Sequence, residues 1–577
     1  MIKKIRYAVF ALMPVIAFYL MEAFEHNPFI EVRDTAQFFN IILFELIAWI
    51  LLFISGQTWI AIDITFACAM LFGLINHYVM KFRSTPFVPW DIYSVKTAKS
   101  VAAGYDFTPE TRIVIVVIAF LVLMIINYFI RIKLEIKMWI RFMSSAALAL
   151  GLYIFALALQ DEQFQTDNYL YPFLFTPAYM TKVNGMAVTF TMDLAYINVD
   201  KPDGYDRDKV IKLLEEYEDD TKKADDGRLP NIIVIMDEAF SDLSILGDFK
   251  TNEDYMPFVH SLFEGAENTI TGYANVSVCG GNTANSEFEF LTGNTMAFLP
   301  GGSIPYQQYI KNDTFSIAGY LKEIGYETYA QHPYYPKGLN RDTVYPLLGF
   351  DNMAFISDYI NRKICREYIS DESSFKKIID TFENKESGKP AFIFNVTMQN
   401  HGSYSDTYDN FTNNVVAEDY NNASLDQYLS LIKITDSEFE KFISYFENVD
   451  EDTIIVLFGD HQPNDSVAYS ILADNGMNYK DLSEDELKLR YKVPYVIWAN
   501  FDIPEDKNKE TSLNYLGAET LKLSGIKLAE YQNFLLELKE AYPVLSAVNM
   551  VTKDTDDDKL EEYKQIQYYY LFDQKGS

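Results

Sequence analysis

Hydrophobic and polar positions divide the chain into two parts. Before about residue 160, long apolar runs recur at Tyr7–Ala23, Phe38–Ser55, Trp59–Met80, Ile113–Ile130 and Phe142–Leu159. Each run is close to the ~20 residues that a helix needs to cross a bilayer, so the pattern predicts five spans. From Asn231 onward, short apolar runs alternate with helical patterns, which predicts an α/β domain with a mainly parallel central sheet. The predicted organisation is a five-span membrane domain (1–160), a linker (161–230) and an α/β domain (231–577).

Basic residues around the apolar runs predict an orientation. Lys3, Lys4 and Arg6 precede the first run, and the basic connection Arg131–Arg141 joins the fourth run to the fifth. Such segments stay in the cytoplasm, so an odd number of crossings places the C-terminal domain outside the cell. The first run lacks a convincing cleavage site and is expected to be a retained signal-anchor. We therefore expect a multi-pass protein of the cell membrane.

Two acidic residues, Glu45 and Asp63, fall inside predicted spans. A charge there is costly unless it faces protein or water. We favour interior polar contacts between helices, with a role in substrate handling as the alternative.

Composition excludes one class of partner and limits covalent cross-linking. The net charge of -33 argues against nucleic acid, because phosphate backbones require patches of Lys and Arg. Three cysteines cannot form a disulfide framework. Since Cys68 lies in an apolar run, only a Cys279–Cys365 bridge is conceivable.

Reactive side chains follow the ends of several predicted strands. The strand candidates are Ile232–Met236, Thr328–Gln331, Ala391–Thr397, Ile454–Phe458 and Tyr495–Ala499. Ligands of parallel sheets gather beyond the carboxyl ends of the strands. The residues that follow these ends therefore predict a site: Glu238, His332, His401, Asp460 and His461. An adjacent carboxylate and imidazole, as in Asp460-His461, suit a divalent metal ion.

A threonine supplies a candidate nucleophile. Gly280–Thr283 predicts a turn into a helix, where free amides and the helix dipole favour an anion. A second Gly-Asn-Thr occurs at Gly293–Thr295, but we favour Thr283 because of its glycine pair and the small residues that follow. A threonine hydroxyl needs a metal or a base for activation. Arg341 suits a phosphate group, with a surface salt bridge as its alternative role. Together these residues predict phosphoryl transfer.

As a set, these motifs resemble the lipoteichoic acid synthases and related phosphoglycerol transferases of the alkaline phosphatase/sulfatase superfamily. The resemblance extends over essentially the whole chain, including the five apolar runs. The matching short segments are Pro86–Asp91, Glu238–Phe240, Gly281–Phe288, Asn340–Asp342, Gly349–Asp351, Asn400–His401, Gly459–His461 and Tyr563–Tyr568.

The resemblance implies a sulfatase-like extracellular domain and a metal-dependent reaction. It assigns a divalent cation, manganese or magnesium, to Glu238, Thr283, Asp460 and His461. It implies that Thr283 attacks phosphatidylglycerol, expels diacylglycerol and passes glycerophosphate to a glycolipid or polysaccharide acceptor. It places three residues around the phosphoglycerol group: Arg341, His401 and His332. The expected location is the envelope of a Gram-positive bacterium, with the lipid bilayer as a further partner.

Two departures from the family pattern concern the acceptor. The polymerising synthases have tryptophan where this chain has Leu339, and aspartate where it has Tyr334. We therefore expect transfer of one or a few units rather than a long polymer. One alternative is a phosphoethanolamine transferase of the same superfamily, although such enzymes usually have several disulfides and a second metal site. The other is a catalytically silent, membrane-anchored scaffold, which the intact metal motif argues against.

Overall fold

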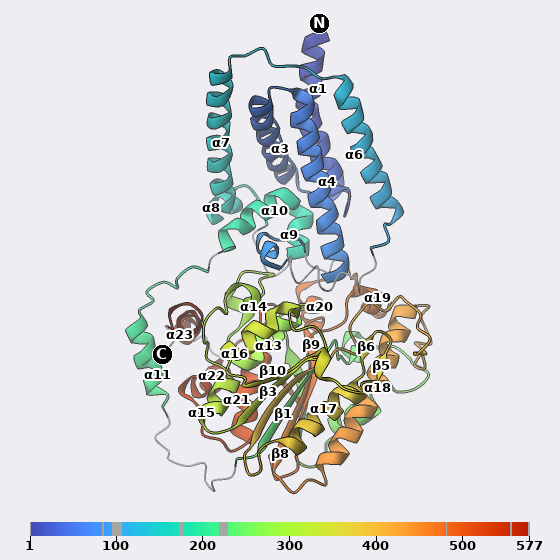
Figure 1. Cartoon of the computed structure of the whole chain (residues 1–577), viewed down its shortest axis with the longest axis vertical. Coiled ribbons are helices and arrows are strands. Elements are labelled where there is room, and N and C mark those ends of the chain that lie inside the picture. The colour runs from blue at the N-terminus through green and yellow to red at the C-terminus, as the bar shows by residue number, and fades with distance from the viewer. Residues whose placement is uncertain are drawn as a thin grey trace. The chain divides into compact units, whose positions relative to one another are not determined.

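A computed structural model describes the chain except for residues 1, 84–85, 95–106, 172–176, 198, 219–228, 480–481, 554–556 and 575–577. The described residues form two compact units that divide near Asp200 (Figure 1). The first unit is helical, and the second contains an eight-stranded sheet.

The first unit consists of helices around an apolar core. They are α1 (Ile2–Glu22), α2 (Pro28–Glu31), α3 (Asp34–Ser55), α4 (Thr58–Arg83), α6 (Thr111–Phe129), α7 (Met138–Gln160), α8 (Glu162–Asp167), α9 (Pro177–Asn184) and α10 (Met186–Asp193). Phe18 of α1, Phe44 of α3 and Phe66 of α4 are buried together in this core. Aromatic packing of this kind joins helices that are apolar on most of their surface.

Four of these helices are long and apolar enough to cross a membrane. Within the described residues they are Asp34–Ser55, Thr58–Lys81, Thr111–Phe129 and Met138–Gln160. The first predicted span coincides with α1, a helix of 21 residues. That helix is not among the four, and its sequence begins with Ile-Lys-Lys-Ile-Arg. Four of the predicted runs are thus found as membrane-type helices.

The two acidic residues of the spans make polar contacts inside the helical unit. The indole Nε1–H of Trp49 donates to Glu45 at 2.9 Å within α3. The side-chain amide of Asn127 on α6 donates to Asp63 on α4, also at 2.9 Å. Each carboxylate therefore has a hydrogen-bond donor, as its position in a predicted span requires.

The segment predicted as a linker is structured in its first half. Helices α8, α9 and α10 precede residue 199, and the side chains of Met180, Met186 and Met192 are buried in the core of the first unit. The prediction of a linker from residue 161 therefore differs from the structure, because apolar residues in this segment pack with the membrane-type helices. The second half contains α11 (Arg207–Glu216), which belongs to the second unit.

The second unit is organised by a mixed, mostly parallel sheet. Its strands, in spatial order, are β10 (Asp506–Ser512), β2 (Thr269–Asn275), β9 (Lys492–Ala499), β8 (Thr453–Gly459), β1 (Asn231–Asp237), β7 (Ala391–Val396), β3 (Glu327–Gln331) and β4 (Asn352–Ala354). Only β9 runs antiparallel to its neighbours, which are β2 and β8. Two small hairpins pair β5 (Ile364–Cys365) with β6 (Tyr368–Ile369) and β11 (Val544–Leu545) with β12 (Met550–Val551).

Helices cover both faces of the large sheet (Figure 1). The α-helices of this unit after α11 are α12 (Pro257–Phe263), α13 (Thr283–Thr292), α14 (Pro305–Gln308), α15 (Ile317–Glu323), α16 (Arg341–Leu347), α17 (Asp371–Asn384), α18 (Ala423–Phe446), α19 (Asp465–Asp474), α20 (Glu484–Leu489), α21 (Leu513–Leu523), α22 (Glu530–Ala541) and α23 (Asp557–Tyr568). Phe290 of α13 packs on Phe394 and Phe458, whereas Ile393 and Leu457 share a core cluster with α18. Both faces are thus buried, as the apolar strands predict.

Candidate metal centre

Two neighbouring strands bring the acidic residues of the site together. Strands β1 and β8 are parallel, and Asp237 lies opposite Gly459 in their register. The next residues, Glu238 and Asp460, therefore leave the sheet side by side at its carboxyl edge. The sequence rule for parallel sheets predicts a site at this edge.

Gly459 allows the two strand ends to approach closely. A Cβ atom at this position would lie 1.9 Å from the carbonyl oxygen of Phe240, a distance that no larger residue tolerates. Ala239 adopts a left-handed conformation with φ 51°, and its N–H donates to Asp460 Oδ1 at 2.7 Å. The turn after β1 thus fixes the Asp460 carboxylate directly.

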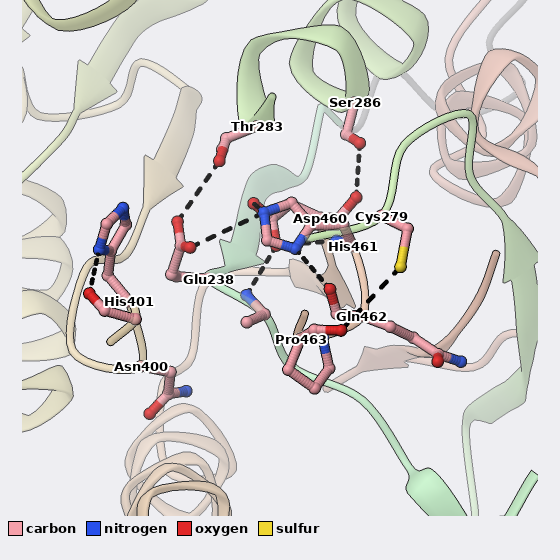
Figure 2. Close-up of polar contacts among 12 residues, drawn as sticks. Glu238, Cys279, Thr283, Ser286, Asn400, His401, Asp460, His461, Gln462 and Pro463 are labelled. Carbon is pink, nitrogen blue, oxygen red and sulfur yellow. Dashed lines mark hydrogen bonds and ion pairs between the residues drawn. The ribbon is translucent and has the colours of Figure 1, made fainter. Parts of the chain in front are cut away.

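Glu238, Asp460 and His461 form a buried cluster whose ligand atoms lie within 4.8 Å of one another (Figure 2). His461 Nε2 is 3.2 Å from Asp460 Oδ2 and 3.8 Å from Glu238 Oε1. Burial, and then the charge of Asp460, raise the pKa of Glu238 well above its usual range. Two carboxylates held together in the interior require a positive charge for stability.

Two buried atoms of the cluster that lack hydrogen-bond partners are suited to bind a divalent metal ion. Asp460 Oδ2 and His461 Nε2 are buried without a hydrogen-bond partner. His461 Nδ1 lies 2.9 Å from the carbonyl oxygen of Gln462, which fixes the tautomer with a lone pair on Nε2. Gln462 is held in turn by Arg490, whose guanidinium donates to its Oε1 at 2.7 Å. A carboxylate–carboxylate–imidazole set with its outer contacts in place is typical of a metal centre.

Thr283 lies at the amino end of α13, next to the cluster (Figure 2). Gly280 and Asn282 have positive φ angles of 72° and 65°, which make the tight turn that precedes the helix. The Thr283 hydroxyl donates to Glu238 Oε2 at 3.4 Å. One turn later, the Ser286 hydroxyl donates to the Asp460 carbonyl at 2.5 Å and ties the helix to β8. The predicted nucleophile and the predicted ligands therefore meet.

Thr295 occupies a different place and makes structural contacts. Its hydroxyl accepts a hydrogen bond from the Ala297 N–H at 3.2 Å and donates to Glu289 at 3.3 Å. Its backbone N–H donates to Gln567 of α23 at 2.8 Å. These contacts cap a short 3-10 helix, Met296–Phe298, so the geometry favours Thr283 over Thr295 as the reactive residue.

The Thr295→Ala variant tests this choice. We expect a loss of about 1 kcal/mol in stability, because a capping hydroxyl is removed from a buried position. The rate of the predicted phosphoryl transfer should remain within about twofold of wild type, since Thr295 is not part of the metal cluster. Thermal unfolding and a turnover assay on the same preparation check both values. A large loss of turnover with unchanged stability would reassign the nucleophile to Thr295.

Arg341 is buried in an ion pair with Glu287 of α13. Its guanidinium donates from Nε to Glu287 Oε1 at 2.9 Å and from Nη1 to His332 Nε2 at 3.1 Å. Glu287 also accepts from the Tyr345 hydroxyl at 2.8 Å. Burial, and then the charge of Arg341, keep the pKa of His332 well below its usual value. His332 is therefore a neutral imidazole that links Arg341 to the Val396 carbonyl.

His401 approaches the cluster from the end of β7 and lies beside Glu238 in Figure 2. Its Nδ1 is 2.7 Å from the Gly402 carbonyl and 3.1 Å from the Tyr368 hydroxyl. Burial lowers the pKa of His401 to about 4, so the ring is neutral at physiological pH. The guanidinium of Arg366 donates to the His401 carbonyl at 2.6 Å and supports this loop.

Three residues that organise the site do not stand out among the sequence motifs. Glu287 lies four residues after Thr283, and this helical spacing is the signal that places it on the same side of α13. Gln462 directly follows the Asp-His pair, where outer contacts of a metal ligand are expected. Arg366 has no such signal, because its carbonyl partners come from a distant loop.

Comparison with known proteins gives the family. The sequence model of the Sulfatase family matches residues 230–526, which is more than half of the chain. A protein of Rhizobium meliloti (strain 1021), named for cyclic beta-1,2-glucan modification, is 31% identical over 433 residues, covering 72% of this chain and 64% of that protein. Lipoteichoic acid synthase 1 of Bacillus subtilis (strain 168) is 24% identical over 274 residues, covering 46% of this chain and 42% of the relative.

A solved structure supports the same fold. The Streptococcus pyogenes phosphoglycerol transferase GacH in complex with sn-glycerol-1-phosphate superposes with a TM-score of 0.53 at 22% identity, over 64% of this chain and 95% of that one.

The chain spans less than two thirds of the length of each curated relative. The expected Gram-positive envelope is not supported, because the relative that matches over more of the chain comes from Rhizobium. The chain belongs to the sulfatase family of the alkaline phosphatase/sulfatase superfamily.

Proposed function

We propose that the protein transfers glycerophosphate from phosphatidylglycerol to a glycan of the cell envelope through a covalent intermediate on Thr283. The observation that carries this proposal is the position of the Thr283 hydroxyl, 3.4 Å from Glu238 at the edge of a buried cluster suited to a metal ion. The resemblance to lipoteichoic acid synthases supports the choice of donor. The name of the Rhizobium relative supports a glycan acceptor.

Glu238, Asp460 and His461, together with the Thr283 hydroxyl, would hold one divalent cation, Mn²⁺ or Mg²⁺. When bound, such an ion lowers the pKa of a hydroxyl and neutralises charge on phosphoryl oxygens. The amino end of α13 favours a phosphate group next to Thr283. The protein residues thus supply the nucleophile, the ligands and a favourable electrostatic field.

The reaction has two displacement steps at phosphorus. In the first, Thr283 Oγ loses its proton and bonds to the phosphorus of phosphatidylglycerol, while the bond from phosphorus to the diacylglycerol oxygen breaks and that oxygen takes a proton. In the second, an acceptor hydroxyl loses its proton and bonds to phosphorus, while the bond to Thr283 breaks and the threonine is reprotonated. Arg341, His332 and His401 are the residues proposed to surround the phosphoglycerol group. His401 is neutral and can act as a hydrogen-bond partner there, whereas both ring nitrogens of His332 are engaged, with Arg341 and with the Val396 carbonyl.

The proposed reaction takes place at the outer surface of the cell membrane. In this proposal α1 is a fifth span, the N-terminus is cytoplasmic and the catalytic domain from Asn231 onward is outside. The basic N-terminus and the basic connection between α6 and α7 support that orientation. On that side the catalytic domain would meet both the donor lipid and the envelope glycan.

Cysteine labelling tests the orientation. In a variant without the three native cysteines, a cysteine at Asp203 should react with a membrane-impermeant thiol reagent in intact cells. A cysteine at Lys137 should react only after the cells are opened. Both positions have exposed side chains, so accessibility to solvent does not distinguish them. The reverse pattern would place the catalytic domain in the cytoplasm and contradict a role in envelope synthesis.

The proposed activity is tested with the full-length chain in phospholipid vesicles. Phosphatidylglycerol labelled in its headgroup should release diacylglycerol when Mn²⁺ is present and transfer the label to an added envelope glycan. Phosphatidylethanolamine under the same conditions should give no transfer. Transfer from phosphatidylethanolamine alone would support a phosphoethanolamine transferase instead. No turnover with either lipid, despite bound Mn²⁺, would support a silent scaffold.

A further inference from the structure

We propose that Tyr334, Tyr335, Tyr368 and Tyr408 form a carbohydrate-binding surface that holds the acceptor beside the catalytic centre. This inference rests on the proposed function and names the chemistry of its second substrate. We call these four residues the tyrosine surface. Tyr334 is the position at which the polymerising synthases have an aspartate.

Three of the four rings of the tyrosine surface are in contact, those of Tyr334, Tyr335 and Tyr368. The ring centroids of Tyr334 and Tyr335 are 4.9 Å apart in an edge-to-face arrangement. Tyr334 and Tyr368 are 6.2 Å apart and tilted. These separations lie in the range at which aromatic rings stabilise one another. Tyr334 and Tyr335 come from one loop, and Tyr368 comes from the β5–β6 hairpin. Together they form one continuous aromatic face.

The cluster is not simply part of the hydrophobic core. The side chain of Tyr335 is 49% exposed, and Tyr334 and Tyr408 are partly exposed. Tyr368 is buried beneath them. A large aromatic side chain that is left half in water beside a catalytic centre, with its partners packed underneath, is typical of a binding surface.

Direct contacts join the tyrosine surface to the predicted phosphoglycerol site. The ring of Tyr334 lies 6.2 Å from that of His332. The Tyr368 hydroxyl is 3.1 Å from His401 Nδ1, and the two rings are 5.3 Å apart. A molecule lying on the tyrosine surface would therefore reach the histidines that are proposed to surround the transferred group.

Arg366 holds the surface in place from below. It is buried and adopts a left-handed conformation with φ 54°. Its guanidinium donates to the carbonyls of Gln399 and His401, while its centre lies 5.9 Å from the Tyr368 ring and 5.8 Å from the Tyr408 ring. A cation over aromatic faces restrains both partners. The tyrosine surface is thus preorganised, which reduces the entropy lost on binding.

The chemistry of the surface matches a sugar. One side of a pyranose ring presents C–H groups that stack on an aromatic face, and its hydroxyls can pair with phenolic O–H groups, which both donate and accept. The net charge of -33 disfavours nucleic acid and other polyanions as occupants. A neutral glycan meets no such repulsion, and its hydroxyl is also the nucleophile that the second reaction step requires.

The experiment compares two acceptors with the full-length chain in vesicles that contain phosphatidylglycerol and Mn²⁺. One acceptor is a cyclic β-1,2-glucan, and the other is glycerol, which is too small to stack on the rings. Tyr335→Ala should raise the KM for the glucan by about tenfold and leave the release of diacylglycerol with glycerol as acceptor within about twofold. Tyr335→Trp should restore glucan transfer. Tyr445→Ala is the matched control, because Tyr445 lies in the last turn of α18, shortly before β8 begins, whereas the site lies where β8 ends.

Each outcome decides the inference. A selective rise in the glucan KM with rescue by tryptophan supports it. If Tyr335→Ala and Tyr445→Ala change the KM for the glucan equally, the inference is overturned. It is also overturned if Tyr335→Ala lowers transfer to the glucan and to glycerol equally, because that result would place Tyr335 in donor binding. If the wild-type chain forms no intermediate on Thr283, the proposed function fails. Direct titration of the protein with the glucan then tests the tyrosine surface by itself, and binding that is unaffected by Tyr335→Ala overturns it.

Discussion

Replacing Thr283 with alanine should reduce glycerophosphate transfer by about 10³-fold or more, while the protein remains folded. The substitution removes the hydroxyl that is proposed to attack phosphorus, and the hydroxyl one turn later, on Ser286, is engaged with the Asp460 carbonyl. The structural loss is small, because the described contact of this hydroxyl is a long hydrogen bond of 3.4 Å to Glu238. Initial rates of diacylglycerol release, measured together with the thermal unfolding temperature, check both parts.

Thr283→Ser is the matched control. It keeps a hydroxyl at the amino end of α13, so a measurable fraction of the activity should remain. If Thr283→Ala and wild type release diacylglycerol at the same rate, Thr283 is not the nucleophile. A loss of activity that coincides with a loss of the folded state would not count as support, which is why unfolding is followed in the same samples.

Asp460→Asn should lower the affinity for Mn²⁺ by about 100-fold or more and reduce turnover in parallel. The asparagine oxygen can still accept from the N–H groups of Ala239 and His461, as Asp460 Oδ1 does at 2.7 and 2.8 Å. The amide nitrogen, however, takes the place of Oδ2, which removes a negative charge and a lone pair from the centre of the cluster. Isothermal titration with Mn²⁺ measures the affinity directly.

Asp436→Asn provides a control of the same chemistry. Asp436 is also buried and accepts two backbone N–H groups, from Phe258 and Val259 at 2.9 and 2.8 Å, but it is not part of the metal cluster. Its variant should bind Mn²⁺ like wild type. Unchanged Mn²⁺ affinity in Asp460→Asn would contradict the assignment of the metal centre, and an equal decrease in both variants would indicate a general loss of structure.

The strands that position the site were predictable because they are buried on both faces. All five apolar runs proposed as strands correspond to members of the large sheet: β1, β3, β7, β8 and β9. Strand β10 carries the polar sequence Asp-Lys-Asn-Lys-Glu-Thr-Ser at an edge, so hydrophobicity does not reveal it. The antiparallel direction of β9 follows from long-range connections that no local pattern encodes.

The site was predictable to the extent that it depends on strand ends. Glu238, Asp460 and His461 meet because parallel strands finish at one edge, and the glycine turn delivers Thr283 to the same place. The ion pair of Arg341 with Glu287 depends on the packing of α16 against α13, which sequence spacing does not determine. For the same reason, the sequence indicated an arginine suited to phosphate but not that its guanidinium is already engaged by the protein.

The most direct test of a covalent intermediate on Thr283 is peptide mass spectrometry. The full-length chain is mixed with Mn²⁺ and phosphatidylglycerol labelled in its headgroup, and the reaction is quenched before an acceptor is added. We predict that the glycerophosphoryl label is found on the peptide that contains Thr283 and that it is absent when the divalent cation is chelated. Release of diacylglycerol without label on Thr283, or with label on another residue, would contradict the account.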